Sequence, residues 1–261
     1  MANLPSTTGD DILKGTEFGD IGYGDLGNDV IYGFAGADGL DGEEGDDILY
    51  GGRGADILTS GRGHDTGADK LYGGAGNDTL MGMGVHGSGY FDGGRGADYI
   101  STLGYDNTVL GGGGADEILL AANVAQHGIG RNVAMGGKGR DSIQSTAGND
   151  LLKGGAGADR LDGREGNDVL VGGRGADTFV FYPEFGRDKI RDFKPEQGDK
   201  LLLTLAVHDG GSMTGEELVE EYGVIRHGLV VKLDMEYDLE IVFGRDVDPD
   251  ALAGAIDFLE F

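Results

Sequence analysis

The sequence predicts an all-β fold: a parallel β-roll, or two-sided β-helix solenoid, of about eighteen nine-residue turns with a small α+β cap at the C-terminus. Three observations predict it: a strict nine-residue period, glycines clustered before a recurring aspartate, and a change to ordinary globular composition after residue 180. Residues 145–180 show the period best, reading STAGNDLLK, GGAGADRLD, GREGNDVLV and GGRGADTFV. Glycine stands at position four, aspartate at position six and a large apolar residue at position eight. This period overrides the low complexity that 55 glycines would otherwise suggest.

One block can be interpreted physically. Its glycines permit positive φ, so six residues can curl into a tight loop whose carbonyl oxygens point inward. The carboxylate at position six adds the hard anionic ligand that Ca²⁺ prefers. Positions seven to nine, such as residues 169–171, form a short strand whose middle side chain points inward. Two blocks close one coil, and each loop is a candidate calcium site.

The block matches the nonapeptide GGxGxDxUx, and the chain therefore resembles the RTX family of secreted calcium-binding proteins. The resemblance implies multiple bound Ca²⁺ ions, export in the unfolded state by type I secretion machinery, and folding outside the cell. Energetics agree with a need for metal. Ordering nine residues costs about 1–2 kcal/mol each, whereas burying one leucine returns about 1.5–3 kcal/mol. Binding free energy then becomes folding free energy.

The array begins almost at the N-terminus, after a leader of residues 1–5, and the predicted roll covers residues 6–180. Between Asp65 and Asp69 the nine-residue period is shifted by four residues, and we count this stretch as one enlarged turn. Later, Gly89, Asn107 and Asn132 occupy position six in place of aspartate. The predicted metal ligands of the roll are Asp11, Asp20, Asp29, Asp38, Asp47, Asp56, Asp65, Asp69, Asp78, Asp98, Asp116, Asp141, Asp150, Asp159, Asp168 and Asp177.

The irregular turns share a parity. Counting from Asp11, turns seven, nine, eleven and thirteen are irregular, whereas turns eight, ten and twelve are nearly perfect. Successive turns of a two-sided roll fall on opposite edges, so the irregular turns are predicted to stack on one edge, with calcium sparse at turns nine, eleven and thirteen. Surface loops often carry partner contacts. This edge is thus a candidate partner-binding surface, for which an extracellular polysaccharide or a cell-surface ligand is considered; the alternative is drift in a roll held by its other edge. Its candidate residues are His64, His86, Tyr105 and His127.

Residues 181–261 are predicted to form a capping and secretion-signal region. Residues 181–203 are similar to the segment that closes the roll of serralysin-type proteases. That resemblance implies that Asp188, Asp192 and Asp199 complete the last calcium sites; the alternative is salt bridges with neighbouring basic residues such as Arg187 and Lys189. The last five residues, DFLEF, resemble the terminus of type I secretion substrates, and the alternative is a simple terminal strand.

Local signals predict the cap's secondary structure. The segment TGEE at residues 214–217 is a capping box that opens a helix. Alternating apolar residues at 229–233 and 239–243 predict a hairpin. Asp248 and Pro249 predict the start of a second helix, running towards Ile256.

Composition excludes several functions. A formal net charge of −27 argues against nucleic acid as a partner, and the chain has no cysteine. No apolar run approaches 18 residues, no amphipathic segment predicts membrane insertion, and the N-terminus does not resemble a secretory signal peptide. Neither HExxH nor GxSxG occurs, and the five histidines show no metal-ligand spacing. We therefore expect no enzymatic activity.

Three functions are weighed. The first is a secreted, extracellular calcium-binding repeat protein with a structural, adhesive or matrix role, favoured by an array that starts close to the first methionine. The second is the C-terminal RTX module of a larger secreted enzyme. The third is a membrane-active secreted effector.

Overall fold

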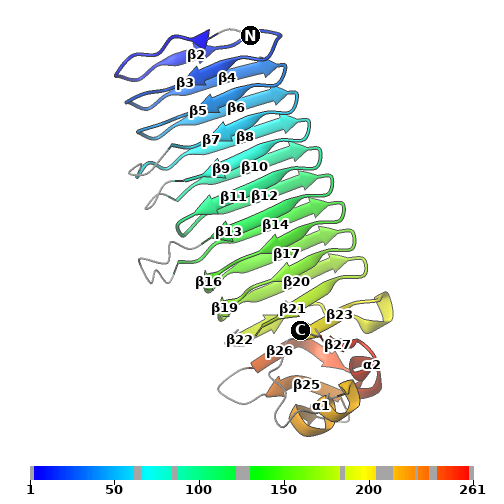
Figure 1. Cartoon of the computed structure of the whole chain (residues 1–261). Helices are drawn as coiled ribbons and strands as arrows, with labels where there is room; N and C mark the ends of the chain where they lie inside the picture. The colour runs from blue at the N-terminus through cyan, green and yellow to red at the C-terminus, as the bar shows by residue number, and fades with distance from the viewer. Residues whose placement is uncertain are drawn as a thin grey trace.

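The computed structural model shows a long two-sided solenoid that ends in a small mixed domain (Figure 1). The structure describes residues 3–61, 66–83, 88–121, 130–182, 186–203, 214–226, 229–234 and 240–258. Consecutive strands alternate between two sheets, and within each sheet neighbouring roll strands pair in parallel, eighteen to twenty-five residues apart. The predicted parallel β-roll is confirmed.

Among the described residues the first sheet has twelve strands. In spatial order these are β1 (Asn3–Leu4), β3 (Ile21–Tyr23), β5 (Gly39–Asp41), β7 (Ile57–Thr59), β9 (Thr79–Gly82), β11 (Tyr99–Leu103), β13 (Glu117–Ala121), β15 (Ser142–Gln144), β18 (Arg160–Asp162), β21 (Thr178–Phe181), β23 (Lys200–Leu203) and β27 (Ile256–Phe258).

The second sheet has thirteen strands in the part of the chain that the structure describes. In spatial order these are β2 (Ile12–Lys14), β4 (Val30–Ala35), β6 (Ile48–Arg53), β8 (Lys70–Ala75), β10 (Tyr90–Arg95), β12 (Thr108–Gly113), β14 (Val133–Lys138), β17 (Leu151–Ala156), β20 (Val169–Arg174), β22 (Arg187–Ile190), β26 (Glu240–Val247), β25 (Leu229–Asp234) and β24 (Gly223–Arg226). A separate parallel pair joins β16 (Ala147–Gly148) to β19 (Glu165–Gly166).

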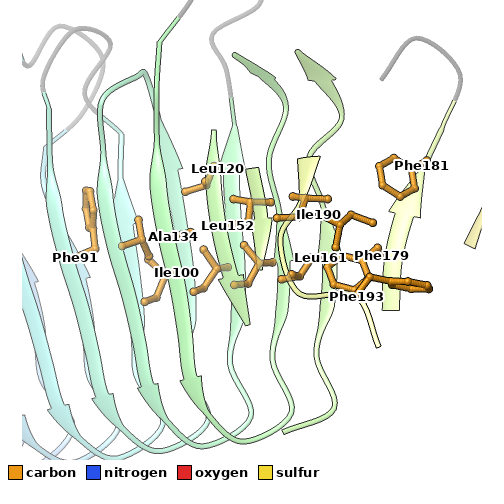
Figure 2. Close-up of a cluster of buried hydrophobic side chains, with 14 of the residues drawn as sticks. Phe91, Ile100, Leu120, Ala134, Leu152, Leu161, Phe179, Phe181, Ile190 and Phe193 are labelled. Carbon is orange, nitrogen blue, oxygen red and sulfur yellow. The ribbon is translucent and has the colours of Figure 1, made fainter. Parts of the chain in front are cut away.

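The core between the sheets is built mainly from a file of position-eight side chains, joined by others such as Leu120 and Phe193, and part of it is shown in Figure 2. Ile31, Leu49 and Leu80 are fully buried. Gly22 is a weak position in this file, and Leu4 occupies the space beside it, since a Cβ on Gly22 would lie 3.1 Å from the Leu4 Cδ1 atom. The thin core explains why each coil can exclude water yet gains little from burial alone.

The roll continues past Val180. Strands β22 and β23 add one further coil to the eighteen nine-residue turns, giving about ten coils, and β26 and β27 then pair with them in parallel. Phe193 packs at this end, with its ring centroid 5.9 Å from that of Phe179 and 5.5 Å from that of Phe243. The cap thus shares the core of the roll.

The cap also contains the predicted local elements. Helix α1 (Gly215–Tyr222) begins with the Thr214–Glu217 capping box, and β25 and β26 form the antiparallel hairpin. A short 3-10 helix, η1 (Pro195–Gln197), precedes β23. Helix α2 (Pro249–Ala253) begins at the Asp248 N-cap but ends before Ile256, because the chain from Ile256 pairs with β23 as strand β27.

Candidate calcium sites

The position-six residues of the roll form two hydrogen-bonded ladders, one along each edge. Turns of odd number lead into the thirteen-stranded sheet and define the odd edge; turns of even number lead into the twelve-stranded sheet and define the even edge. In each ladder a position-six N–H donates to the Oδ1 atom of the position-six residue one coil further on, as from Asp20 to Asp38 at 2.7 Å. The even ladder joins Asp20, Asp38, Asp56, Asp78, Asp98, Asp116, Asp141, Asp159, Asp177 and Asp199 without a break. The odd ladder includes Asp11, Asp29, Asp47 and Asp69, is interrupted at Gly89, and resumes through Asn107, Asn132, Asp150, Asp168 and Asp188.

The second carboxylate oxygen of many ladder residues is buried without a hydrogen-bond donor. On the even edge this holds for the Oδ2 atoms of Asp38, Asp56, Asp78, Asp98, Asp116, Asp141, Asp159 and Asp177, and on the odd edge for those of Asp29, Asp168 and Asp188. A buried, unpaired carboxylate oxygen is costly, and native proteins compensate it with a donor or a cation. These oxygens are therefore candidate calcium ligands.

Backbone oxygens converge on the same points. A Cβ placed on Gly33, at position one, would lie 2.4 Å from the Asp38 Oδ2 atom and 2.6 Å from the carbonyl oxygen of Gly51 in the next coil. The same geometry recurs at Gly154, where the distances to the Asp159 Oδ2 atom and the Gly172 carbonyl oxygen are 2.5 Å and 2.7 Å. Glycine thus keeps open a space that carboxylate and carbonyl oxygens line together, as Ca²⁺ requires.

Each such site relies on backbone oxygens. Within the described ranges no group of three or more acidic, histidine or cysteine side chains is placed to hold a metal ion. A calcium ion held by Asp38 would take one side-chain oxygen there and further oxygens from the backbone of adjacent coils. The residues fit Ca²⁺ better than a metal that prefers nitrogen or sulfur ligands.

Burial raises the pKa of the ladder carboxyls in the metal-free protein. Desolvation is the main cause, and it raises the pKa of Asp56, Asp98 and Asp159 to about 6. Near the cap, desolvation together with the charge of Asp188 raises the pKa of Asp168 to about 9. Desolvation likewise raises the pKa of Asp188 to about 8. A divalent cation at these oxygens would favour the ionised form and oppose the shift.

Some turns provide their own donor instead. The Thr16 N–H and hydroxyl both donate to the Asp20 Oδ2 atom, at 2.6 and 2.8 Å. Thr7 does the same for Asp11. In turn fifteen the hydroxyl of Ser145, at position one in place of glycine, donates to the Asp150 Oδ2 atom. These hydroxyl groups were not among the predicted site residues, although a Ser or Thr early in the loop is a visible signal.

In the described parts of turns nine and eleven, side chains of the protein occupy or bond the loop. In turn nine, a Cβ on Gly89 would lie 2.3 Å from the Phe91 ring, as would a Cβ on Gly82, so the ring occupies the space that an aspartate would need. In turn eleven, the Asn107 amide donates to the carbonyl oxygen of Leu103 at 3.4 Å. The odd turns seven, nine, eleven and thirteen do share one edge, as their parity predicts, whereas the even-edge loops repeat regularly at the right of Figure 1.

The predicted ligands in the cap segment occupy different positions. Asp188 and Asp199 extend the two ladders. The Asp199 Oδ2 atom accepts a hydrogen bond from the Lys194 N–H at 2.7 Å. Asp192 lies outside the ladders and accepts hydrogen bonds from the Gly172 and Gly173 N–H groups, at 2.9 and 2.8 Å. Calcium binding by these three residues stays a prediction.

The candidate partner-binding residues are only partly described. His64, His86 and His127, and the predicted ligand Asp65, lie outside the described residues. Tyr105 is half-buried, and a Cβ on Gly130 would lie 1.8 Å from the Tyr105 Cβ atom, so the tyrosine packs closely on the next odd turn. This contact gives Tyr105 a packing role.

One polar cluster, at the cap end of the odd edge, was not predicted from the sequence. The Arg164 Nε atom lies 3.0 Å from the Asp162 Oδ2 atom, and the guanidinium carbon lies 4.0 Å from the centroid of the Tyr182 ring. Asp162 is buried, and desolvation raises its pKa while the charge of Arg164 lowers it. Arg164 takes the loop position that glycine normally holds, with φ of 63°.

Fold and site together define a calcium-binding parallel β-roll. Seven segments match the family model described as RTX calcium-binding nonapeptide repeat (4 copies): residues 6–33, 14–48, 36–66, 66–84, 92–122, 128–152 and 144–179. These segments cover more than half of the chain, which therefore belongs to the RTX calcium-binding repeat family and binds multiple Ca²⁺ ions. No curated protein matches the chain at a significant level.

Proposed function

We propose that this chain is a secreted RTX protein that folds on calcium outside the cell and has a structural, adhesive or matrix role without enzymatic activity. The observation that carries the proposal is the file of eight buried Oδ2 atoms on the even edge that have no donor from the protein. A fold that buries so many unpaired carboxylate oxygens depends on cations for its stability.

Calcium levels favour an extracellular site of action. Extracellular calcium modules bind with dissociation constants of about 10⁻⁴ to 10⁻³ M, far above cytoplasmic free calcium. The net charge of −27 would also keep the metal-free chain expanded, which suits export before folding. Type I secretion machinery, guided by the C-terminal region, is the proposed route. No helix among the described residues is long and apolar enough to cross a membrane.

Circular dichroism tests the proposal. In chelator the full chain should show little strand signal, and millimolar Ca²⁺ should produce a cooperative transition to β-structure. The control is Mg²⁺ at equal concentration, which demands a smaller octahedral site and should fail to fold the chain. Equal folding by both ions would contradict calcium-specific oxygen cages.

A further inference from the structure

Basic residues that are widely spaced in the sequence form one straight row along the even edge. Register pairs Arg53 with Ala75, Ala75 with Arg95, Arg95 with Gly113, and Gly113 with Lys138. Lys138 then pairs with Ala156, and Ala156 with Arg174. All of these residues occupy position three of an even-edge loop. A cation therefore recurs at every second coil, and a small residue lies between each two. We call Arg53, Arg95, Lys138 and Arg174 the basic row.

The basic row is accessible and bears a single sign of charge. All four side chains are exposed, and none forms a salt bridge with another described residue. In the even-edge loops from residue 51 to residue 177, every charged residue apart from the position-six aspartates is basic, since Arg140 is the only addition. In a protein of net charge −27, this stretch of the even edge is locally basic, whereas the first even-edge loop, residues 15–20, carries Glu17 at the same position.

The spacing of the row suits an extended ligand. Neighbouring coils of a parallel sheet lie about 4.8 Å apart, so cations on alternate coils are separated by about 10 Å, and the row extends over about 30 Å. The alanine and glycine residues between the cations have small side chains or none, so they leave room for a linear chain to lie along the row. A compact anion would contact one cation only, whereas a linear polymer could contact all four.

An exposed aromatic residue lies at the N-terminal end of the row. Phe34 immediately precedes Ala35, the register partner of Arg53, and its side chain is 46% exposed. It holds φ at 76°, where the repeat normally has glycine. A bulky residue in this region is strained, and such strain is common at functional sites. One ring face is stacked on Tyr32, at a centroid distance of 5.9 Å.

We propose that the even edge binds a linear acidic polysaccharide, with the basic row contacting carboxylates along one face of the polymer and Phe34 packing against a sugar ring. In an extended polyuronate with two sugars per turn, alternate sugars present their carboxylates on the same side, so the charges on one face are two sugar rings apart. Two sugar rings have about the same length as two coils of the roll. The spacing of the carboxylates therefore matches the spacing of the cations, and the polymer could bind the row without a kink.

Nucleic acid fits the row less well. Phosphates along one DNA strand recur at about 3.4 Å, so a row with one cation per 10 Å would leave most of them unpaired beside an acidic protein. The sparse cations match a polymer with sparse charge. The inference rests on the proposed function, because the row exists only when the roll is folded, and it names the ligand class of an adhesive or matrix role.

The test measures binding of soluble oligogalacturonates of increasing length to the full chain in millimolar Ca²⁺, by isothermal titration calorimetry. The wild-type affinity should rise with length until the oligomer spans the row, and neutral oligosaccharides of equal length should not bind. The variant R53Q/R95Q/K138Q/R174Q should lose at least tenfold in affinity. Phe34→Gly should lose about threefold, and it also relieves the strained φ.

A matched variant controls for charge. K14Q/K70Q/R131Q/K189Q removes four exposed cations that lie off the row, with the same change in net charge, and should keep its affinity within twofold. Equal losses in the two quadruple variants, no dependence on oligomer length, or tighter binding of double-stranded DNA than of oligogalacturonate would each overturn the proposal. Circular dichroism in the same buffer separates the two ideas: failure to fold on calcium contradicts the proposed function, whereas a folded wild-type chain that does not bind contradicts this inference alone.

Discussion

The two edges of the roll carry the same nine-residue repeat but differ in how the polar groups of each turn are paired. On the even edge the ladder is continuous, and eight of its carboxylates have a buried oxygen that needs a cation. On the odd edge the ladder loses its aspartate at Gly89, Asn107 and Asn132, and side chains such as the Phe91 ring fill the space. The comparison shows that a nonapeptide turn can be closed by metal or by the protein itself. We therefore expect metal along the even edge where the odd edge has lost its aspartates.

The edges also differ in charge. Described odd-edge loops carry acidic residues beyond position six, including Asp25, Glu43, Glu44 and Asp46, whereas the even-edge loops carry the basic row. The odd edge thus adds negative charge where the even edge adds positive charge. If the edges also differ in their contribution to the free energy of folding, changes to the even edge should have larger effects than changes to the odd edge.

Deleting residues 182–261 should have the largest effect, because it removes the end of both ladders. Asp188 and Asp199 accept the hydrogen bonds of the Asp168 and Asp177 N–H groups, and the cap covers the last apolar residues of the core. Terminal repeats decide stability in one-dimensional arrays. The calcium midpoint of folding, measured by circular dichroism, should rise severalfold or more. An unchanged midpoint would show that the cap is dispensable.

Acidification should have opposite effects with and without calcium. In the metal-free roll, burial raises the pKa of Asp56, Asp98 and Asp116 to about 6, above the ordinary value near 4. Protonation therefore stabilises the metal-free fold fully below pH of about 4, and this contribution is lost as the pH rises through about 6.

In chelator, strand signal should thus increase between pH 7.5 and pH 5. With calcium present, protons compete for the same oxygens, so the calcium midpoint should increase over that range. Light scattering should run alongside as a control for aggregation near the isoelectric point. A metal-free chain that gains no structure at pH 5 would show that the even-edge carboxylates do not limit folding.

Single substitutions should separate the edges. Asp98→Ala removes a candidate calcium ligand and the acceptor for the Asp78 N–H, so we expect it to cost roughly 2–4 kcal/mol at fixed calcium and to remove one bound ion. Asn107→Ala removes only neutral hydrogen bonds on the odd edge and should cost about 1 kcal/mol with no change in bound calcium. Denaturant melts and calcium stoichiometry measure both quantities. Similar calcium losses in the two variants, or occupied sites at turns nine, eleven and thirteen in a calcium-soaked crystal, would remove the distinction between the edges.

Ser145→Gly should have the smallest effect on stability and the most specific effect on metal. The substitution restores glycine at position one and frees the Asp150 Oδ2 atom from its hydroxyl donor. One additional calcium ion should bind, and the metal-free protein should lose about 1 kcal/mol. Mass spectrometry under native conditions can count the ions. Ser145→Ala serves as the control, since it removes the hydroxyl but leaves a Cβ in the cage.

The sequence predicted what the period controls: the two sheets, the core at position eight, the parity of the irregular turns and the local elements of the cap. It did not predict in which turns the protein itself provides a hydrogen-bond donor to the Oδ2 atom, because this depends on whether a hydroxyl such as that of Thr16 reaches that atom. It also did not predict the basic row, because insertions of unequal length separate its members in the sequence. Those insertions occur on the odd edge, so they leave the even-edge register intact.

The ladders also have a direction. Except at the Gly89 break, each position-six N–H in the ladders donates to a carboxylate or amide one coil nearer the C-terminus, as Asp159 donates to Asp177. Removing coils from the N-terminal end takes away donors and leaves acceptors that water or metal can serve. Removing coils from the C-terminal end takes away the carboxylates that accept from the N–H groups of the coil before. The ladders should therefore tolerate a change of length better at the beginning of the roll than at its end, where Asp188 and Asp199 provide the last acceptors.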